Sequence, residues 1–156
     1  MLQFKPQMSI TGSIDEQLVR LLARDARQNS ETLAKQLNIS SATVRRRLRR
    51  LIRSGSLRIV GVVDPIAFDL PLAVVITLDV APDNLESAME ALAKKPEVGW
   101  ISTTTGRFDI IALAQFRSSE RLSNFITKEL TQLEGVKDSE TFVCLNVKKG
   151  RYVHLT

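Results

Sequence analysis

Arginines dominate one short segment of the sequence, where six of them fall within nine residues: Arg45, Arg46, Arg47, Arg49, Arg50 and Arg53. The planar guanidinium group can donate two parallel hydrogen bonds to a phosphate or to the O6 and N7 atoms of guanine, which a lysine ammonium group cannot do. At about 100° per residue in a helix, Arg46, Arg49, Arg50 and Arg53 share one face. Arg45 lies on its flank, and Arg47 falls near the apolar side, where we expect an ion pair or a snorkelling side chain. The segment predicts a helix that binds a polyanion.

The positive charge is concentrated in the first part of the chain. Residues 1–60 carry 12 Lys and Arg against 4 Asp and Glu, a balance of +8, whereas residues 61–156 carry 10 against 13, a balance of −3. A compact basic segment attracts nucleic acid because each neutralised phosphate releases condensed counterions, and the same duplex would repel the acidic remainder. The distribution predicts double-stranded DNA as the partner of the first part.

Two short helices are expected ahead of the arginine-rich helix. Ser13 and Glu16 have the form of a capping box before the first helix. Ser30 is the expected cap of the second helix, which ends near Asn38, a residue that tolerates the left-handed backbone of a tight turn. These elements predict a helix-turn-helix unit.

The third helix is expected to begin after Ser40 and to pack through an apolar stripe: Val44, Leu48, Leu51 and Ile52. Gly55 ends this helix. Residues 57–63 are expected to form a β-hairpin wing, which would bring Arg58 to the phosphate backbone. The first part is therefore predicted to be a winged helix-turn-helix domain.

The second part has the element order β-α-β-β-α-β. Strands are expected at residues 72–80, 98–105, 108–116 and 140–147, with helices at 85–92 and 122–133. This order predicts a ferredoxin-like fold, so the whole chain is assigned to the α+β class. One sheet face would expose apolar side chains, among them Val75, Ile111 and Leu113, and this exposure predicts a homodimer.

Several other kinds of chemistry are excluded by the residue types. The single cysteine, Cys144, and the single histidine, His154, cannot supply an internal disulfide or a structural zinc site. The sequence has no nucleophile–base pair, phosphate-binding glycine loop or paired-carboxylate motif. Its apolar stretches are much shorter than the ~20 residues of a membrane-spanning helix. We expect a cytoplasmic, non-enzymatic protein with no cofactor, metal or membrane partner and no secretory leader.

Residues 40–57 resemble the recognition-helix signature of the Lrp/AsnC family of transcriptional regulators, also called feast/famine regulatory proteins. The family pattern S-x-x-T-V-x-R-R-I-x-R-L-x-x-x-G-x-I is matched from Ser40 to Leu57, with leucine at its two isoleucine positions. Arg27 and Leu33-Ala34 fit the preceding family segment. Asp64-Pro65 matches the start of the family linker, although Asp69 stands where many members have glycine.

The resemblance and the helix positions together assign an interface with DNA. We expect Ala42, Arg45, Arg46 and Arg49 to contact base edges, and Ser40, Thr43, Arg50 and Arg53 to contact phosphates; Ser41 lies in the same surface. The resemblance also implies that the second part is a RAM-type sensor domain and that dimers often assemble into octamers. The expected domains are an arm at 1–12, the DNA-binding domain at 13–63, a linker at 64–71 and an effector-binding and oligomerisation domain at 72–156.

The turn Gly106-Arg107-Phe108-Asp109 resembles the family motif G-x-[YF]-D, which implies a small-molecule effector, usually an amino acid, at an interface between dimers. Glycine lets backbone amides approach a carboxylate, and an aspartate can bind an ammonium group. Thr104, Thr105 and Thr141 are further candidates. The alternative is that Gly106 and Asp109 only form a tight hairpin and that the threonines reflect β-propensity.

Two other functions are considered for the whole chain. Sirohaem decarboxylases have an Lrp/AsnC-like fold, but they rely on histidines in the sensor domain, and the only histidine here is His154. An architectural protein that coats DNA with little sequence preference would share the basic surface. The leading hypothesis is a sequence-specific regulator of transcription whose two DNA-binding domains bind successive major grooves.

Overall fold

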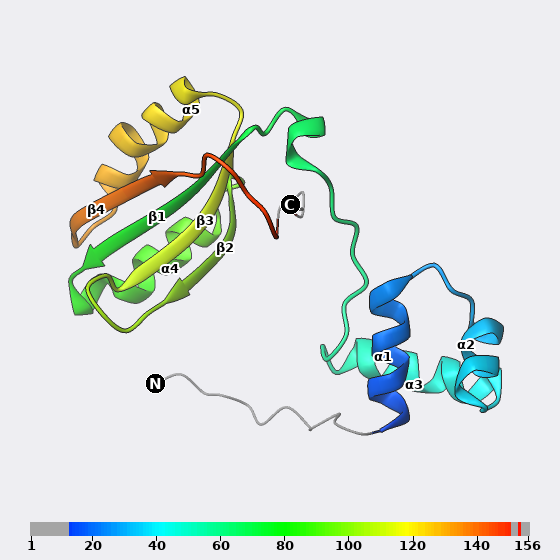
Figure 1. The fold of residues 1–156 in the computed structure, drawn as a ribbon. Helices are drawn as coiled ribbons and strands as arrows, with labels where there is room; N and C mark the ends of the chain where they lie inside the picture. The colour runs from blue at the N-terminus through cyan, green and yellow to red at the C-terminus, as the bar shows by residue number, and fades with distance from the viewer. Residues whose placement is uncertain (1–12, 151–152, 154–156) are drawn as a thin grey trace. The chain divides into compact units, whose positions relative to one another are not determined.

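A computed structural model provides the fold, and the structure describes residues 13–150 and Val153. The arm expected at residues 1–12 lies outside the described residues, as does His154. The chain divides into two compact units, 1–60 and 61–156, and each is described by itself (Figure 1). We expected the DNA-binding domain to end at residue 63, whereas the division falls after Val60.

The N-terminal unit begins with two capped helices. In α1 (Ile14–Arg24), Ser13 Oγ accepts a hydrogen bond from the backbone N–H of Glu16, as the capping box predicts. In α2 (Ser30–Leu37) the expected cap, Ser30, is wrong, because Asn29 is the cap. The Asn29 amide oxygen accepts from the backbone N–H groups of Glu31 and Thr32, at 3.1 and 2.8 Å, and so satisfies two orphan donors.

The turn into the third helix follows the prediction closely. Asn38 adopts the left-handed conformation, with φ 52° and ψ 47°, and ends α2. Ser40 Oγ accepts from the backbone N–H of Thr43 at 3.1 Å and caps α3 (Ser41–Arg53). Gly55 follows α3 with φ 72°. The predicted helix-turn-helix unit is confirmed.

The three helices bury a small apolar core: Leu18, Leu22, Leu33, Ala34, Val44 and Leu51. Leu48 packs against this core as a partly buried residue. Ile52, expected in the same stripe, is 49% exposed, so its assignment is wrong. Eight residues at 100° turn its side chain roughly 80° away from Val44.

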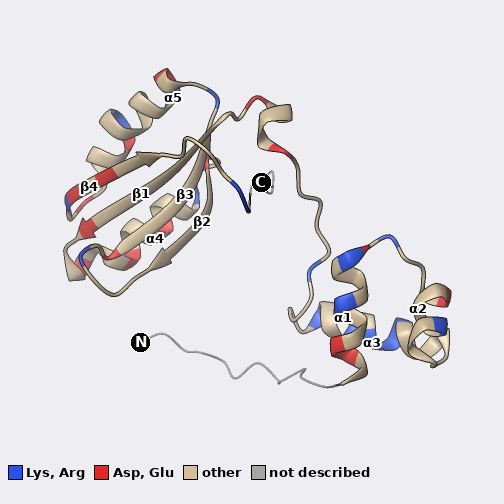
Figure 2. Cartoon of the chain, in the orientation of Figure 1, with Lys and Arg blue, Asp and Glu red and all other residues tan. Residues whose placement is uncertain are grey.

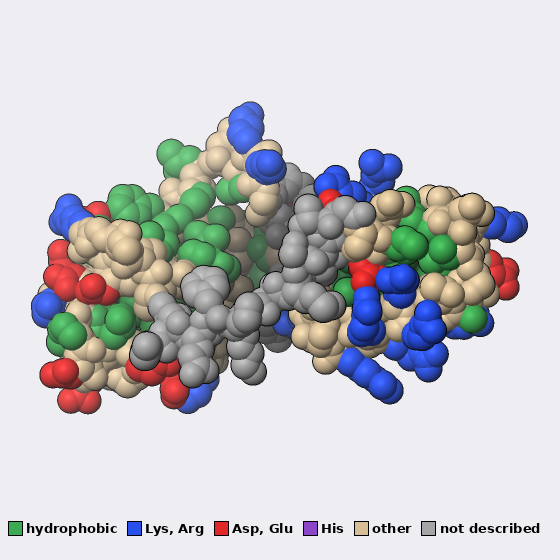
Figure 3. Space-filling model, turned by 90° about the horizontal axis from the view of Figure 1, so that it is seen from below, with side chains coloured by type: hydrophobic (Ala, Val, Ile, Leu, Met, Phe, Trp, Pro, Cys, Tyr) green, Lys and Arg blue, Asp and Glu red, His purple; other side chains and the backbone are tan. Residues whose placement is uncertain are grey.

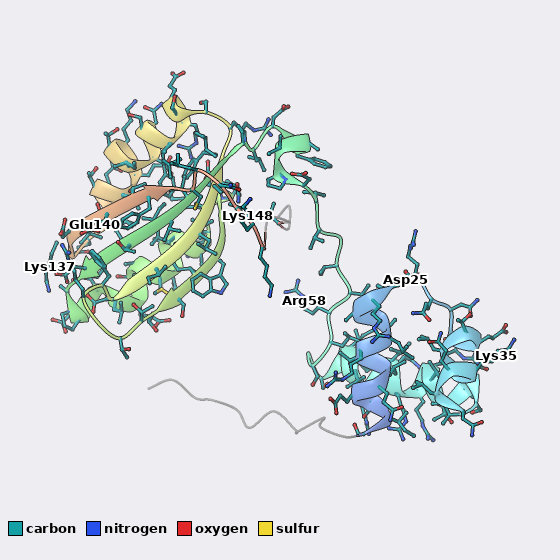
Figure 4. All side chains as sticks on the ribbon, in the orientation of Figure 1. Asp25, Lys35, Arg58, Lys137, Glu140 and Lys148 are labelled. Atoms are coloured by element: carbon teal, nitrogen blue, oxygen red, sulfur yellow. The ribbon has the colours of Figure 1, made fainter. Side chains whose placement is uncertain are left out.

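The β-hairpin wing expected at residues 57–63 is not formed. Residues 57–62 have no regular structure, and Val63 forms an isolated bridge with Val153. A hairpin needs two strands joined by a turn, and this segment supplies only one extended run. Arg58 is exposed on that run (Figure 4), so there is no wing to direct it toward a duplex.

The C-terminal unit is an antiparallel sheet with helices on one face (Figure 1). Its strands are β1 (Leu72–Val80), β2 (Val98–Thr103), β3 (Ile110–Phe116) and β4 (Val136–Val143), in the order β2-β3-β1-β4. The helices are α4 (Leu85–Ala93) and α5 (Ser119–Asn124), and α5 continues through a π-helical turn, Phe125–Glu129, and a 3-10 turn, Leu130–Gln132. The predicted ferredoxin-like α+β order is confirmed.

Three of the four strands differ from the prediction in their bounds. Strand β2 ends two residues early and β3 begins two residues late, because residues 104–109 form the connecting turn. Strand β4 occupies 136–143 instead of 140–147. Gly135, with φ 79°, completes the turn after Leu133. The strand can therefore begin directly after this glycine, and Val136 pairs with Val80.

The linker contains a short helical turn, Pro65–Phe68, that begins at Asp64. Asp64 Oδ1 accepts from the backbone N–H of Ile66 at 3.2 Å. Asp69 ends the turn with φ 57°, a left-handed conformation that glycine adopts freely and that aspartate is among the few other residues to tolerate. Asp69 therefore adopts a backbone conformation that glycine at this position could also adopt.

Candidate nucleic-acid interface

Helix α3 presents one apolar side to the core and a basic side to solvent. Val44 and Leu51 are buried, whereas five of the six arginines are exposed: Arg45, Arg46, Arg49, Arg50 and Arg53. Lys and Arg residues colour most of the outer side of α3 in Figure 2, and their side chains gather on the N-terminal unit in Figure 3. The basic face expected from the sequence is formed by one continuous helix.

Four arginines of this face surround an open recess at the end of α3, together with Ser54: Arg46, Arg49, Arg50 and Arg53. The recess has a volume of about 590 Å³. Among the described residues, Arg46 and Arg53 have no ion-pair or hydrogen-bond partner, and Arg49 Nε donates only to the Arg45 carbonyl at 3.4 Å. Their guanidinium donors are available to an external anion.

Arg47 and Arg50 are held by one carboxylate from another helix. Arg47 Nη1 donates to Asp15 Oδ1 at 2.9 Å, and Arg50 Nη2 donates to Asp15 Oδ2. The Asp15 side chain is only 8% exposed, against 28% for Arg47 and 53% for Arg50. The expected ion pair of Arg47 is therefore formed, and Asp15 fixes α3 to α1.

Asp15 was not recognised as an interface residue from the sequence. It lies three and seven residues before Leu18 and Leu22, so it belongs to the buried stripe of α1. A carboxylate on an apolar stripe requires a partner, because burying an unpaired charge is strongly unfavourable. That pattern could have pointed to an arginine on a neighbouring helix.

The hydroxyl groups at the start of α3 contribute to capping. Ser40 Oγ and Thr43 Oγ1 are hydrogen-bonded to each other at 2.9 Å, and Ser40 also accepts from the Thr43 backbone. Ser40 and Ala42 are exposed, whereas Ser41 and Thr43 are half-buried. These residues lie at the N-terminal end of α3, where backbone N–H groups and the helix dipole favour an anion.

The turn at residues 104–109 uses several of its polar groups internally. Asp109 Oδ2 accepts from the backbone N–H of Val80 at 2.9 Å, next to the irregularity in the β1–β4 pairing. Thr104 Oγ1 donates to the Phe108 carbonyl at 2.6 Å. Gly106 has φ 125°, a conformation that requires glycine. The Asp109 bond and the Gly106 conformation favour the tight-hairpin interpretation of these two residues, and the Thr104 hydroxyl also bonds within the turn. Thr105, Gly106 and Arg107 are exposed.

Arg107 connects this turn to β4. Its Nη2 atom lies 2.9 Å from Glu140 Oε1, and its guanidinium carbon lies 4.9 Å from the centre of the Phe108 ring. Glu140, labelled on β4 in Figure 4, was not predicted as part of the turn. Thr141 follows Glu140 and points to the opposite sheet face, because strand side chains alternate. No described bond joins Thr141 to the turn.

The sheet face away from the helices carries an apolar row across all four strands. Trp100 pairs with Leu113, Leu113 pairs with Val75, and Val75 pairs with Phe142. Trp100, Leu113 and Phe142 are 50%, 47% and 50% exposed. The exposed apolar face expected from the sequence is present.

The part of the chain that the structure describes offers neither a metal site of clustered side chains nor a membrane-spanning helix. No cluster of three His, Cys, Asp or Glu side chains there could hold a metal ion. None of the helices within residues 13–150 combines the length and apolar character needed to cross a bilayer.

Comparison with protein families matches both parts of the chain. The AsnC-type helix-turn-helix domain matches residues 13–52, and the Lrp/AsnC ligand binding domain matches residues 73–153. An uncharacterized HTH-type transcriptional regulator of Pyrococcus abyssi is 31% identical over 143 residues, which cover 91% of this chain and 90% of the relative. A regulator of Pyrococcus furiosus named FL11 is 27% identical over 141 residues, covering 90% and 93% of the two chains.

Solved structures share the same fold. Escherichia coli AsnC has a TM-score of 0.79 at 22% identity, covering 86% of this chain and 92% of its own. A Neisseria meningitidis transcriptional regulator, solved as a complex with L-Met, has a TM-score of 0.79 at 24% identity, covering 87% and 90%. The matches extend over both units.

Proposed function

Since this chain belongs to the Lrp/AsnC family of transcriptional regulators, we propose that α3 binds in the major groove and selects DNA sequence through its arginines. The observation that carries the proposal is the exposed guanidinium face of α3, in which Arg46 and Arg53 have no partner among the described residues. Guanidinium groups on a packed helix can bind guanine edges or phosphates bidentately, and those without a partner break no existing ion pair when they do so.

The proposal divides the interface into two sets of residues. Base edges are contacted by Ala42, Arg45, Arg46 and Arg49. Phosphates are contacted by Ser40, Thr43, Arg50 and Arg53, with Ser41 beside them. The exposure of the arginines supports their contact with DNA, and the position of Ser40 at the helix N-terminus supports its contact with a phosphate.

A selection of bound fragments from genomic DNA tests the function. A site-specific regulator enriches a common, pseudo-palindromic motif, whereas an architectural protein recovers fragments without one. Arg46→Ala should reduce the preference for the motif by about 1–3 kcal/mol, whereas Arg53→Ala should weaken binding to motif and random duplexes alike. Equal effects of the two substitutions on both duplexes would contradict the division of roles.

We also propose that the chain is a homodimer built through the outer sheet face, and that dimers can assemble into octamers. The row Trp100–Leu113–Val75–Phe142 supports a self-complementary interface, because a large exposed apolar patch is typical of a binding surface. Leu113→Lys should shift the mass measured by light scattering toward the monomer. An unchanged mass would place the interface elsewhere.

A small effector, such as an amino acid, is proposed to bind at the turn 104–109. Its exposed part, Thr105 to Arg107, supports contact with a carboxylate, and the structural relative solved with L-Met supports this class of ligand. Asp109 Oδ2 already accepts from the backbone N–H of Val80, and the remaining lone pairs of the carboxylate could accept from the ammonium group. Light scattering and DNA titration with a panel of amino acids, L-Met included, test the effector; unchanged mass and affinity would oppose it.

The proposal contains no catalytic step and requires no cofactor. The enzymatic alternative relies on histidines in the C-terminal domain, and the sequence supplies only His154. Relatives named as transcriptional regulators favour the regulator over the enzyme.

A further inference from the structure

We propose that Asp15 is a positioning residue of the DNA interface, which holds Arg47 and Arg50 so that Arg50 presents the free part of its guanidinium group to a phosphate. This inference rests on the proposed function. It adds to that function a residue of α1 that does not itself touch DNA.

The burial of Asp15 is the first observation. Its side chain is 8% exposed in the apolar stripe of α1, and both of its oxygens bind arginines of α3. The two arginines lie 32 and 35 residues away in sequence, so these bonds join two helices and are not part of a helix ladder. A buried carboxylate with such partners sets where their guanidinium groups lie.

The position of Arg50 is the second observation. Its side chain is 53% exposed and lines the recess with Arg46, Arg49 and Arg53. A guanidinium group has five N–H donors, and the bond to Asp15 through Nη2 is the only one described for Arg50. The remaining donors are therefore held in place beside the recess. Fixing them before binding reduces the side-chain entropy that is lost when a phosphate is bound.

Arg47 has a different part in the same cluster. It is 28% exposed, and its Nε atom is buried without a partner in the described residues. It does not line the recess. Arg47 therefore holds α3 against α1, whereas Arg50 makes the proposed phosphate contact.

Charge repulsion and side-chain positioning predict opposite changes in DNA affinity when Asp15 is replaced. A negative charge near a DNA interface repels phosphates, so its removal alone would tighten binding. If Asp15 positions Arg50, its removal weakens binding although the net charge rises. The sign of the change separates the two explanations.

The test compares Asp15→Asn with Asp25→Asn on the full chain, using the duplex recovered by genomic selection. Asp25 provides a matched control because it pairs with Arg27 outside α3, at 3.1 Å, and its substitution changes the net charge equally (Figure 4). Asp15→Asn should weaken binding roughly tenfold, whereas Asp25→Asn should leave binding unchanged or slightly tighter. Binding by Asp15→Asn that is as tight as that of Asp25→Asn would overturn the proposal.

A second variant covers the case in which Asp15→Asn does not fold, as judged by circular dichroism. Arg50→Lys keeps both the charge and Asp15 but removes the fork that can bind Asp15 and a phosphate together. It should also weaken binding roughly tenfold. Where Asp15→Asn does fold, the double variant should bind no more weakly than either single variant. Wild-type affinity in folded Arg50→Lys would overturn the proposal.

The proposed function and the positioning role of Asp15 are contradicted by different results. If the wild type and Asp25→Asn bind no duplex, the proposed function fails and the positioning role fails with it. If both bind and Asp15→Asn binds equally well, only the positioning role fails.

Discussion

The two units contain ion networks of opposite composition. In the N-terminal unit one carboxylate, Asp15, lies between two arginines. In the C-terminal unit one arginine, Arg121, lies between Glu97 and Glu129, and Lys95 also binds Glu129, at 2.7 Å. The first network has one surplus positive charge and borders the recess lined by Arg46, Arg49, Arg50 and Arg53, whereas the charges of the second network are balanced.

The balanced network is a structural connection. Lys95 and Glu97 lie between α4 and β2, and Arg121 lies on α5, so the network joins the two helical segments on the same sheet face. The Arg121 guanidinium carbon is 5.8 Å from the ring centre of Phe125, a fully buried residue. The surplus guanidinium charge of the first network faces solvent, where an anion can reach it, whereas the matched charges of the second network satisfy one another within the fold.

The largest predicted effect on stability is that of Arg121→Ala. Removing this side chain leaves Glu97, 13% exposed, without its cation, and the free energy of unfolding should fall by about 2 kcal/mol after allowance for solvent screening. Urea unfolding followed by circular dichroism measures the change. The control is Arg117→Ala, an exposed arginine with no described partner, which should change stability by less than about 0.5 kcal/mol. Equal stability of the two variants would remove the distinction between the networks.

The surplus charge of the N-terminal unit should be visible in the salt dependence of DNA binding. Arg53→Gln should reduce the slope of log Kobs against log salt by about 0.9, because one phosphate contact is lost. Arg117→Gln, in the C-terminal unit, should leave the slope unchanged. Fluorescence anisotropy at several salt concentrations measures both. A reduction for Arg117→Gln as large as that for Arg53→Gln would contradict the assignment of DNA binding to one unit.

The balanced network should make stability depend on acid pH. The side-chain hydrogen bond from Arg121, followed by that from Lys95, lowers the pKa of Glu129 from its ordinary value of 4.5, and the bond to Glu129 raises the pKa of Arg121. Because the folded pKa of Glu129 is below the unfolded one, its stabilisation is complete above pH 4.5 and is lost as the pH falls through the folded value.

Thermal unfolding between about pH 6 and about pH 3 measures this effect. The Tm of Glu129→Gln should fall less over this range than that of the wild type, since the variant lacks the titrating carboxyl. Parallel curves for the two proteins would show that Glu129 does not contribute.

The smallest effect is expected for an exposed pair on the same sheet. Lys137 Nζ lies 3.4 Å from Asp79 Oδ1, with side chains 55% and 38% exposed. Lys137→Gln should change the free energy of unfolding by less than about 0.5 kcal/mol, because exposed ion pairs are screened by water and salt. A loss similar to that of Arg121→Ala would show that burial does not set the strength of these pairs.

The elements that follow strong local signals were predictable from the sequence. Strand β1 has the predicted bounds because every second residue from Leu72 to Val80 is apolar. Asn38 and Ser40 mark the turn and the cap of the helix-turn-helix unit through their own side-chain chemistry. The wing was wrong because β-propensity at residues 57–63 does not supply a second strand. The cap of α2 was misplaced by one residue because Asn29 and Ser30 are both good caps.

The candidate site was predictable only where it lies on one helix. The arginine face follows from helical spacing, whereas the bonds of Asp15 to α3 and of Glu140 to Arg107 join segments that are 32 or more residues apart. Spacing within one element cannot show which distant residue completes an ion pair. In the turn 104–109, likewise, only the fold shows that Asp109 binds the backbone of Val80.

Hydrogen–deuterium exchange of the full chain, with and without the selected duplex, tests the central assignment most directly. We predict that DNA slows exchange in the segment from Ser40 to Ser54 and leaves exchange in the sheet strands β1 to β4 unchanged. Protection confined to the C-terminal unit, with no change in α3, would contradict the account.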